Sequence, residues 1–593
     1  MLKTKKITKL SDLDKVDKLG GFFESIIISL PIWEADVVYP FKDTFTNQKA
    51  VKNIQTLVSK VEPSIKEGGA LFIYGSPVQL TKIYENLSKD LKFRYWIALE
   101  ILNSFKLNQT SNLKHNHIGV LMLTKGKGYL SLNTKETRTP YFACTSCGRN
   151  TKDWGGKKHL MNNKGGGISD VWRDMFQVLG HKTDPDNKNI TIQEIDSSKL
   201  SFNFVNDKIP KPVLERLLSL VNEKEGNVLL VETASSFIDK INTFKKSENI
   251  KPLVFDASAI TNKVILGDCI SEMEKLAKKY PDGIFDLVFA DPPYNLKKDY
   301  KVYDDTLADE EYMQWCDRWL ELCVKLTKPT GSLLILNIPK WALRHAKKLN
   351  KLAYLQNWIV WDALSTPKGK IMPAHYALLY YTKNPVGFTY NHFDEVSAPE
   401  YCLRANCVNA RERLKESIVE IKGKERMVKT SPISDIWWDL YRIKHKKNRD
   451  DHPCQLPDKL MDRIIKMFSR EGDLVFDPFA GAGTTAIRAM KNKRNYTTIE
   501  IDPYYKAITE KKLEQVKNNG DVVRKTVNKN PKSMYTKKSL EVKVQEFSQQ
   551  LGRKPELEEF LNKFSLDLSQ IELLYGDPRR VLKAGRIGVL NKA

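Results

Sequence analysis

The residues with the clearest chemical potential lie at 291–294, where the sequence reads Asp-Pro-Pro-Tyr. They follow the apolar run 285–290, which predicts a buried strand that ends at Asp291. A carboxylate and a neighbouring carbonyl can accept hydrogen bonds from the exocyclic amino group of a nucleobase, and an aromatic ring can stack on a base that has left its helix. Two prolines stiffen the backbone between these groups. The pattern predicts a catalytic segment made of Asp291, Pro292, Pro293 and Tyr294.

A second segment has the features of a nucleotide-binding turn. Residues 474–485 read as an apolar strand, a glycine-rich turn and the start of a helix. Gly481 and Gly483 permit a tight turn close to a ligand, and Thr484 opens the helix, whose N-terminus attracts a carboxylate. The next strand ends at Glu500, 19 residues after Gly481. A carboxylate in that place can accept hydrogen bonds from ribose hydroxyls.

Together, these two segments resemble the DNA amino-methyltransferases that use S-adenosylmethionine, and their order is similar to that of the permuted beta class. The resemblance implies methyl transfer to a flipped base in double-stranded DNA, either beside a cognate restriction endonuclease or as an orphan methylase. Aspartate rather than serine at 291 is the family's usual mark of adenine-N6 methylation. Cytosine-N4 methylation, an RNA substrate and a non-catalytic DNA-binding regulator remain as alternatives.

The same resemblance implies further contacts to the cofactor. Asp268 lies in the run 264–269, just before a predicted helix, and would reach the adenine of the cofactor; a helix N-cap is its alternative role. Gln455 belongs to a His-Pro-x-Gln motif at a helix entry, in which Leu456 replaces the family's lysine. The remaining cofactor contacts that the resemblance implies are Asn295, Asp477 and Phe479, with Gly481, Gly483, Thr484 and Glu500.

The first half of the chain repeats the second. Three apolar runs, which start at positions 22, 69 and 95, have counterparts 262 residues later. The pattern Ile-Ser-Asp, a β-branched residue and Trp occurs at both 168–172 and 433–437. Matches in the same order along both halves predict an α/β protein with two tandem Rossmann-like methyltransferase folds.

The first copy lacks the residues that carry the chemistry. Ser29 stands in place of Asp291, Ile32 in place of Tyr294, and residues 231–236 contain no glycine turn. We therefore expect a degenerate scaffold and DNA-binding domain that makes the chain an intrachain pseudodimer, with a homodimer as the alternative. The segment that starts at Ser29 also resembles the loop of cytosine-N4 members, so a second active site in the first half remains an alternative.

Composition and breaks in the apolar pattern divide the chain into domains. We predict the degenerate domain at 1–245 and the catalytic domain at 255–520. A lysine- and asparagine-rich linker precedes a small helical module at 535–593 that could bind DNA. The basic stretch 366–430 lies where the permuted family inserts its target-recognition element, although a solvated face is an equal alternative.

The composition narrows the class of protein. The 593 residues include 96 Lys and Arg against 72 Asp and Glu, and the net charge of +24 favours a polyanionic partner. Eight cysteines in so long a chain, without an apolar run of about 18 residues, predict a cytoplasmic protein with no disulfide framework and no membrane span. Cys144, Cys147 and His159 supply too few ligands for a closed zinc site, so we expect no metal. The basic loop 152–159 could contact phosphate.

Overall fold

The computed structural model divides the chain into two compact units, and each is considered by itself. Unit 1 consists of residues 1–443 and 456–513, and unit 2 consists of residues 444–455 and 514–593. The residues whose structure is described are 2–7, 12, 22–31, 48–100, 113, 115–128, 131–139, 141–143, 162–163, 165–173, 180–182, 209–221, 226–233, 256–296, 306–363, 371–385, 387–391, 394–395, 415–421, 424–440, 442, 455–522, 536–575 and 577–585.

An eight-stranded sheet forms the second half of unit 1. The five strands at one end are parallel to one another, because each pairs in parallel with its neighbour. Strand β16 runs antiparallel to both of its neighbours, and β20 is parallel to β15. The spatial order is β12 (Lys263–Leu266), β22 (Asn495–Glu500), β21 (Leu474–Asp477), β13 (Phe285–Ala290), β14 (Thr327–Asn337), β16 (His375–Thr382), β15 (Tyr354–Asp362) and β20 (Ile436–Trp437).

A seven-stranded sheet forms the first half of unit 1. Four parallel strands are followed by the antiparallel strand β5, and the last strand, β9, is parallel to β4. The spatial order is β1 (Leu2–Ile7), β11 (Val228–Thr233), β2 (Phe23–Ser29), β3 (Ile65–Gly75), β5 (His117–Lys125), β4 (Leu91–Glu100) and β9 (Val171–Trp172).

The two sheets share one plan, including its irregularities. Strands β2 and β3 shift in register between Phe23 and Ser25, and β13 and β14 shift between Phe285 and Leu287, 262 residues later. The β4–β5 and β15–β16 pairs also shift in register at positions 262 residues apart. At the edge, β1 occupies the place that β22 has in the second sheet, although it comes from the start of the chain. The predicted α/β fold class is confirmed; the ancestry of the first copy remains a proposal.

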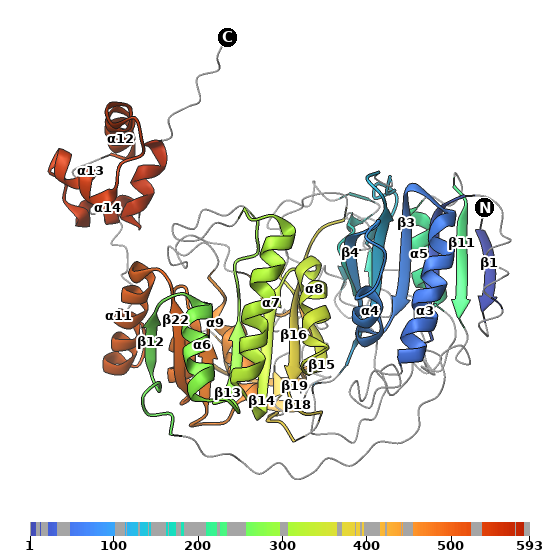
Figure 1. Ribbon diagram of the computed structural model, residues 1–593, viewed down its shortest axis with the longest axis horizontal. Helices are drawn as coiled ribbons and strands as arrows, with labels where there is room; N and C mark the ends of the chain where they lie inside the picture. The colour runs from blue at the N-terminus through green and yellow to red at the C-terminus, as the bar shows by residue number, and fades with distance from the viewer. Residues whose placement is uncertain are drawn as a thin grey trace. The chain divides into compact units, whose positions relative to one another are not determined.

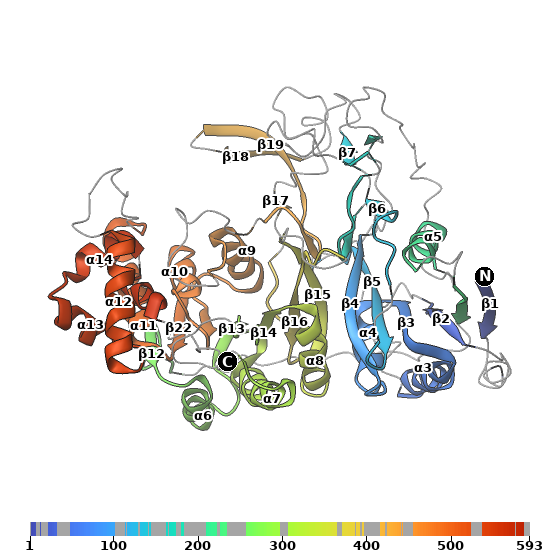
Figure 2. The same cartoon turned by 90° about the horizontal axis from the view of Figure 1, so that it is seen from above.

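Helices cover both faces of the two sheets (Figures 1 and 2). They form because their apolar residues recur at helical spacing, as in α9, which buries Leu460, Ile464 and Phe468 on one side. The helices on one face are α3 (Gln48–Val61), α4 (Pro77–Tyr84), α6 (Cys269–Lys279), α7 (Asp309–Leu326) and α8 (Pro339–Leu349); those on the other are α5 (Lys211–Leu220), α9 (Asp458–Phe468) and α10 (Thr484–Lys491).

A single apolar core crosses from one half of unit 1 to the other. Its buried members include Leu80 and Trp96 of the first half and Trp341 and Trp358 of the second. A second cluster belongs to the first half but includes Ile371 of the second. The two halves are therefore joined by burial of apolar surface.

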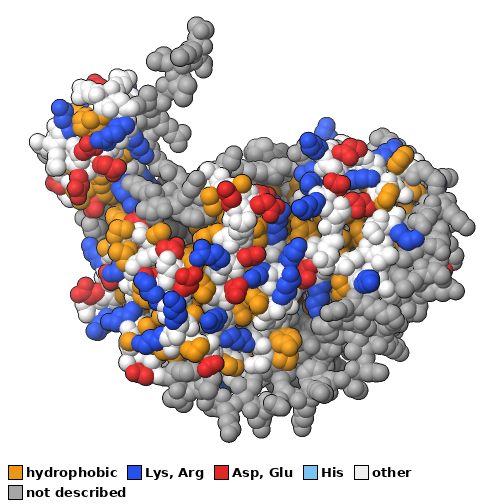
Figure 3. All heavy atoms as spheres, in the orientation of Figure 1, with side chains coloured by type: hydrophobic (Ala, Val, Ile, Leu, Met, Phe, Trp, Pro, Cys, Tyr) orange, Lys and Arg blue, Asp and Glu red, His pale blue; other side chains and the backbone are white. Residues whose placement is uncertain are grey.

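The surface of the protein carries charges of both signs. On the face shown in Figure 3, Lys and Arg side chains are intermixed with Asp and Glu and do not gather into one basic patch.

The predicted recognition insert is only partly described. It contains β17 (Asp394–Glu395), β18 (Lys415–Ile421) and β19 (Lys424–Pro432), which pair in the order β17-β19-β18. Figure 2 shows the β18–β19 ribbon extending away from the eight-stranded sheet. Short antiparallel pairs in the first half are β6 (Arg138–Thr139) with β8 (Gly166–Gly167) and β7 (Tyr141–Ala143) with β10 (Gly180–Lys182), and η2 spans Glu62–Ser64.

Unit 2 contains a small helical module with a core of its own. Leu540, Phe547, Phe560 and Ile571 are among the residues buried there. The first helix of this module, α12 (Lys537–Leu551), ends at Leu551 because Gly552 takes a left-handed conformation, with φ 64°. Helix α11 (Pro503–Asn519) leads from unit 1 into unit 2, and the module consists of α12 (Lys537–Leu551), α13 (Leu557–Phe564), α14 (Leu568–Tyr575) and the 3-10 helix η7 (Pro578–Gly585).

Two sequence predictions bear on parts that the structure covers incompletely. Cys144, Cys147, His159 and the basic loop 152–159 lie outside the described residues. Among the residues that are described, no cluster of three or more potential metal ligands occurs, and no helix is long and apolar enough to cross a membrane.

Candidate active site

Four acidic residues lie at the carboxyl ends of four neighbouring parallel strands. Asp291 follows β13, Asp477 ends β21 and Glu500 ends β22, while Asp268 lies two residues beyond the end of β12. The registers align these ends, since Asp477 pairs with Thr498 and Glu500 with Leu266. In open α/β sheets, ligands bind in the crevice outside the carboxyl ends of the strands. The predicted catalytic and cofactor segments therefore meet at one edge.

The catalytic segment is held by its own tyrosine. The hydroxyl of Tyr294 donates a hydrogen bond to Oδ1 of Asp291, with 2.6 Å between the oxygens. Tyr294 is 8% exposed, and its ring lies 6.2 Å from that of Tyr376 on β16. Asn295 takes a left-handed conformation, with φ 52°, which turns the chain away after Tyr294. Tyr294 thus orients the carboxylate, and stacking on a base, as predicted from the sequence, would require its ring to be uncovered.

Two aromatic side chains support this segment through its backbone. The hydroxyl of Tyr312, on α7, donates a hydrogen bond to the carbonyl of Pro293 at 2.6 Å. The indole Nε1 of Trp341, on α8, donates to the carbonyl of Tyr294 at 2.8 Å. Both side chains are buried, and their rings lie 4.8 Å apart. Because two consecutive carbonyls are fixed by helices packed on the sheet, the segment is positioned by the core of the domain.

The glycine turn is shaped by Asp477. Its Oδ1 accepts a hydrogen bond from the backbone N–H of Phe479 at 2.8 Å, and its Oδ2 accepts from the hydroxyl of Thr485 at 2.5 Å. Burial raises the pKa of the Asp477 carboxyl to about 6, while the bond from Thr485 lowers it. The structure therefore places Asp477 as a brace across the turn. Its predicted contact with the cofactor remains a prediction.

Two glycines give the turn its conformation. Gly481 and Gly483 have φ values of 52° and 80°, a region that favours glycine. A Cβ at Gly483 would also lie 2.4 Å from Cγ2 of Thr509. Helix α10 begins at Thr484 with no side-chain cap and no acidic residue in its first turn. Such a helix start leaves backbone N–H groups that can bind a carboxylate.

Glu500 connects the turn to the neighbouring strand. Its Oε2 accepts a hydrogen bond from the backbone N–H of Gly481 at 2.7 Å, and its Oε1 accepts from Asp502 N–H at 2.9 Å. Burial raises the pKa of the Glu500 carboxyl to about 7. A carboxylate has about four lone-pair sites, so each oxygen can accept a further hydrogen bond. Glu500 therefore fits the predicted role of receiving ribose hydroxyls beside the glycine turn.

Three other predicted cofactor residues have local roles in the structure. Oδ1 of Asp268 caps α6 by accepting from the backbone N–H of Ser271 at 3.0 Å, which is the alternative role considered from the sequence. The ring of Phe479 packs against Trp319, with centroids 5.3 Å apart. Gln455 belongs to unit 2, whose placement relative to this edge is not described. Their contacts with a cofactor stay predictions.

The same edge of the first sheet is built differently. Strand β11 stays paired with β2 as far as Ser29, which pairs with Glu232. In the second sheet β21 pairs with β13 only at Leu287 and Val288, before the position that Asp291 occupies. The hydroxyl of Thr233 also donates to the carbonyl of Ser29 at 2.8 Å. Strand pairing in the first sheet thus continues through Ser29, the position that corresponds to Asp291.

The loop that follows β2 in the first half also receives a hydrogen bond from a helix. Nε2 of Gln79 donates a hydrogen bond to the carbonyl of Pro31 at 2.8 Å, just beyond the end of β2. Trp341, 262 residues after Gln79, donates instead to the carbonyl of Tyr294, one position beyond Pro293, which is the counterpart of Pro31. Sequence reasoning missed Tyr312, Trp341 and Gln79. The only available signal was their place on helices next to the aligned apolar runs.

Comparisons with known proteins find sequences similar to the second half of the chain. A sequence profile of DNA methylases matches residues 285–511. The Type II methyltransferase M.BamHI of Bacillus amyloliquefaciens is 35% identical over 252 residues, which are 42% of this chain and 55% of that protein. The Type II methyltransferase M.HpaI of Haemophilus parainfluenzae is 30% identical over 265 residues, which are 44% of this chain and 78% of that protein.

A third relative carries a more specific name. The DNA adenine methyltransferase YhdJ of Escherichia coli (strain K12) is 28% identical over 249 residues, which are 41% of this chain and 79% of that protein. The chain spans about half the length of M.BamHI and more than two thirds of M.HpaI. The fold is that of an α/β protein with four acidic residues at the carboxyl ends of neighbouring parallel strands. This chain belongs to the DNA methylase family.

Proposed function

We propose that this protein is a site-specific DNA adenine-N6 methyltransferase that uses S-adenosylmethionine. The observation that carries the proposal is the meeting of Asp291, held by Tyr294, with the glycine turn and Glu500 at the carboxyl ends of adjacent strands. A carboxylate for an amino group and a nucleoside-binding turn are the two parts that such a reaction needs. The similarity to YhdJ supports adenine as the target base.

The residues at the turn fit the cofactor. The bare N-terminus of α10 suits the methionine carboxylate, and the carboxylate of Glu500 suits the ribose hydroxyls. At Gly483 the left-handed backbone and the nearby Thr509 leave no room for a side chain. S-adenosylmethionine supplies a methyl group on a sulfonium, which is already activated for transfer. The contribution of the protein is therefore orientation.

The catalytic segment orients the amino group of the target base. Asp291 accepts a hydrogen bond from that group in addition to the one from Tyr294, and the carbonyl of Pro292 accepts a second. These bonds favour a pyramidal nitrogen whose lone pair can attack. Asp291 need not be a strong base, because the proton is acidic once the nitrogen has been alkylated. The stiff Asp-Pro-Pro backbone, held by Tyr312, keeps both acceptors in place.

The first half is proposed to act as the scaffold of an intrachain pseudodimer. The core that it shares with the second half supports this role, as does the continuous strand pairing at its own edge. We further propose double-stranded DNA as substrate, with the insert 366–430 in recognition, and a restriction-modification context with a cognate endonuclease. A cytoplasmic location follows from such a substrate.

The direct test of the proposed function identifies the product. The purified chain is incubated with deuterated-methyl S-adenosylmethionine and unmethylated plasmid DNA, and the nucleosides are then analysed by mass spectrometry. Labelled N6-methyladenine is expected. Labelled N4-methylcytosine would replace the proposed base with the alternative, and DNA binding without any label would favour a regulator. Parallel reactions with single-stranded RNA distinguish the substrate class.

A further inference from the structure

One aspartate of the first half reaches into the second. Asp170 follows Ser169, which bridges in parallel to Met372 of the second half. The Oδ1 atom of Asp170 accepts a hydrogen bond from the backbone N–H of Ala374 at 2.8 Å and another from that of His375 at 3.1 Å. Asp170 is itself buried, at 4% exposure. A carboxylate that accepts two backbone N–H groups fixes the path of the chain that carries them.

That path leads directly to the catalytic segment. His375 begins β16, and the next residue, Tyr376, places its ring 6.2 Å from the ring of Tyr294. Tyr294 in turn holds Asp291 through its hydroxyl. The backbone that Asp170 fixes is therefore one residue from the ring that packs beside the catalytic tyrosine.

Backbone and ring contacts reinforce this attachment. The N–H of Met372 donates to the carbonyl of Ile168 at 2.9 Å, and the N–H of Asp170 donates to the carbonyl of Met372 at 3.1 Å. The Nε2 atom of His375 accepts from Nε1 of Trp358 at 3.0 Å, and Trp358 stacks on Trp96 of the first half. The first half thus holds the backbone of Met372, Ala374 and His375, and the side chain of His375 reaches it through Trp358.

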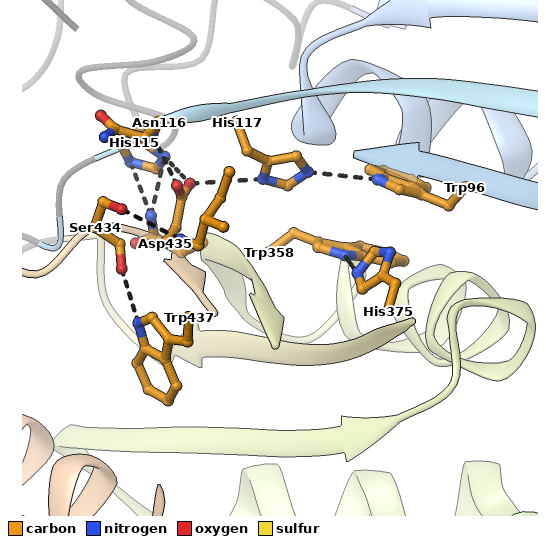
Figure 4. A network of polar contacts seen from close by, with 11 residues as sticks. Trp96, His115, Asn116, His117, Trp358, His375, Ser434, Asp435 and Trp437 are labelled. Carbon is orange, nitrogen blue, oxygen red and sulfur yellow. Dashed lines mark hydrogen bonds and ion pairs between the residues drawn. The ribbon is translucent and has the colours of Figure 1, made fainter. Parts of the chain in front are cut away.

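The pseudosymmetry of the chain supplies a matched residue that acts in the opposite direction. Asp435, in the second Ile-Ser-Asp motif, accepts a hydrogen bond from the backbone N–H of Asn116 in the first half at 2.7 Å. Its Oδ2 lies 3.6 Å from Nδ1 of His115 and 3.7 Å from Nδ1 of His117. Asp435 therefore fixes the corresponding loop of the copy whose edge lacks the catalytic residues (Figure 4).

We propose that Asp170 of the first half is a positioning residue for the active site of the second half. By holding the backbone of Ala374 and His375, it sets the place of Tyr376 and thereby the packing of Tyr294 beside Asp291. The first half therefore does more than cover an apolar face, because it completes the support of a site whose chemistry lies wholly in the other half. This inference rests on the proposed function.

The chemistry of Asp170 suggests a conservative variant. Burial raises the pKa of its carboxyl to about 8, although the N–H groups of Ala374 and His375 lower it. A neutral amide oxygen of the same shape can accept the same two hydrogen bonds. Asp170→Asn is therefore expected to keep the attachment, whereas Asp170→Ala removes it.

The experiment compares Asp170→Ala, Asp170→Asn and Asp435→Ala in the full chain. For Asp170→Ala we expect kcat to fall by about tenfold or more, because small misplacements near reacting groups are costly, while KM for S-adenosylmethionine stays within about threefold. Asp170→Asn should restore most of kcat. Asp435→Ala removes a comparable contact between the halves and should retain kcat within about threefold. Equal losses of kcat in the two alanine variants, or none in either, would overturn the proposal.

Hydrogen exchange provides a readout that does not depend on turnover. Peptides that cover residues 372–380 should lose protection in Asp170→Ala and keep it in Asp435→Ala, with circular dichroism showing that both variants are folded. If Asp170→Ala does not fold, Asp170→Asn is compared with the unchanged chain. Loss of protection of the backbone N–H groups of residues 374 and 375 in Asp170→Asn would contradict the proposed attachment. A chain that shows this pattern of protection but methylates no DNA would contradict the proposed function and leave the attachment standing.

Discussion

Trp96 and Trp358 stack face to face, with ring centroids 3.9 Å apart and ring planes 5° from parallel. They occupy the same position in the two sheets, 262 residues apart, and each donates its indole N–H to a buried histidine on the adjacent strand. The two halves therefore meet at equivalent positions. This is the arrangement expected of an isologous interface contained in one chain.

The Trp96–Trp358 pair should contribute strongly to stability. Replacing either ring by alanine removes a fully buried side chain and should lower the free energy of unfolding by about 3–5 kcal/mol. The double variant should lose less than the sum, because each single change already removes the stacking contact. Chemical denaturation of the three variants measures this, and strictly additive losses would show that the stack itself contributes nothing.

Gly483→Ala should abolish binding of S-adenosylmethionine. The new Cβ would lie 2.4 Å from Cγ2 of Thr509 and force the turn to move. Gly472→Ala is the matched control, since Gly472 also has a positive φ, 87°, but nothing within 4 Å of the added Cβ. Titration calorimetry should show binding in the control and none in Gly483→Ala. Equal affinities in the two variants would separate the turn from the cofactor site.

Cofactor affinity should depend on pH through Glu500. Burial raises the pKa of this carboxyl to about 7, so it is largely protonated below that pH. The ionised form accepts hydroxyl hydrogens better, so affinity should increase as pH rises through about 7, by up to about tenfold between pH 6 and pH 8. Calorimetry across this range measures the effect. Glu500→Gln should bind more weakly and without this dependence; an equal slope in both would assign it to another group.

The hydroxyl of Tyr312 should matter for turnover more than for cofactor binding. Tyr312→Phe removes its hydrogen bond to Pro293 but keeps the packing, and we expect kcat to fall by about tenfold. Tyr380→Phe is the control, because it removes a buried hydroxyl that pairs with Ser332 on a neighbouring strand. Steady-state kinetics of both variants should separate them. Similar kcat values would remove Tyr312 from the support of the catalytic segment.

The sequence was sufficient to predict the fold class and the meeting of two segments at one edge. The apolar runs have the length and spacing of strands, and they place Asp291 and Glu500 at strand ends. The glycine-rich stretch after one of these runs places Gly481 in the turn that follows β21. The aligned runs start close to the register shifts at Phe23 and Phe285, which the sequence did not predict. Membership of the DNA methylase family is confirmed.

The hydrogen bonds that individual site residues make could not be predicted from the sequence in the same way. Asp268 caps a helix and Asp477 braces the turn because their carboxylates find nearby backbone N–H or hydroxyl groups, which depends on atomic geometry. The contact of Asp170 with Ala374 joins residues more than 200 positions apart. Periodicity identifies which residues are buried but not which distant backbone group a buried carboxylate meets.

In the proposed function, Asp291 and Tyr294 carry methyl transfer to adenine. The most direct measurement is single-turnover methylation of duplex DNA by Asp291→Ala and Tyr294→Ala, with calorimetry of S-adenosylmethionine on the same samples. We predict that both variants lose labelled N6-methyladenine while the cofactor dissociation constant stays within about tenfold, or 1.4 kcal/mol. Near-normal formation of labelled N6-methyladenine by both variants would contradict the assignment.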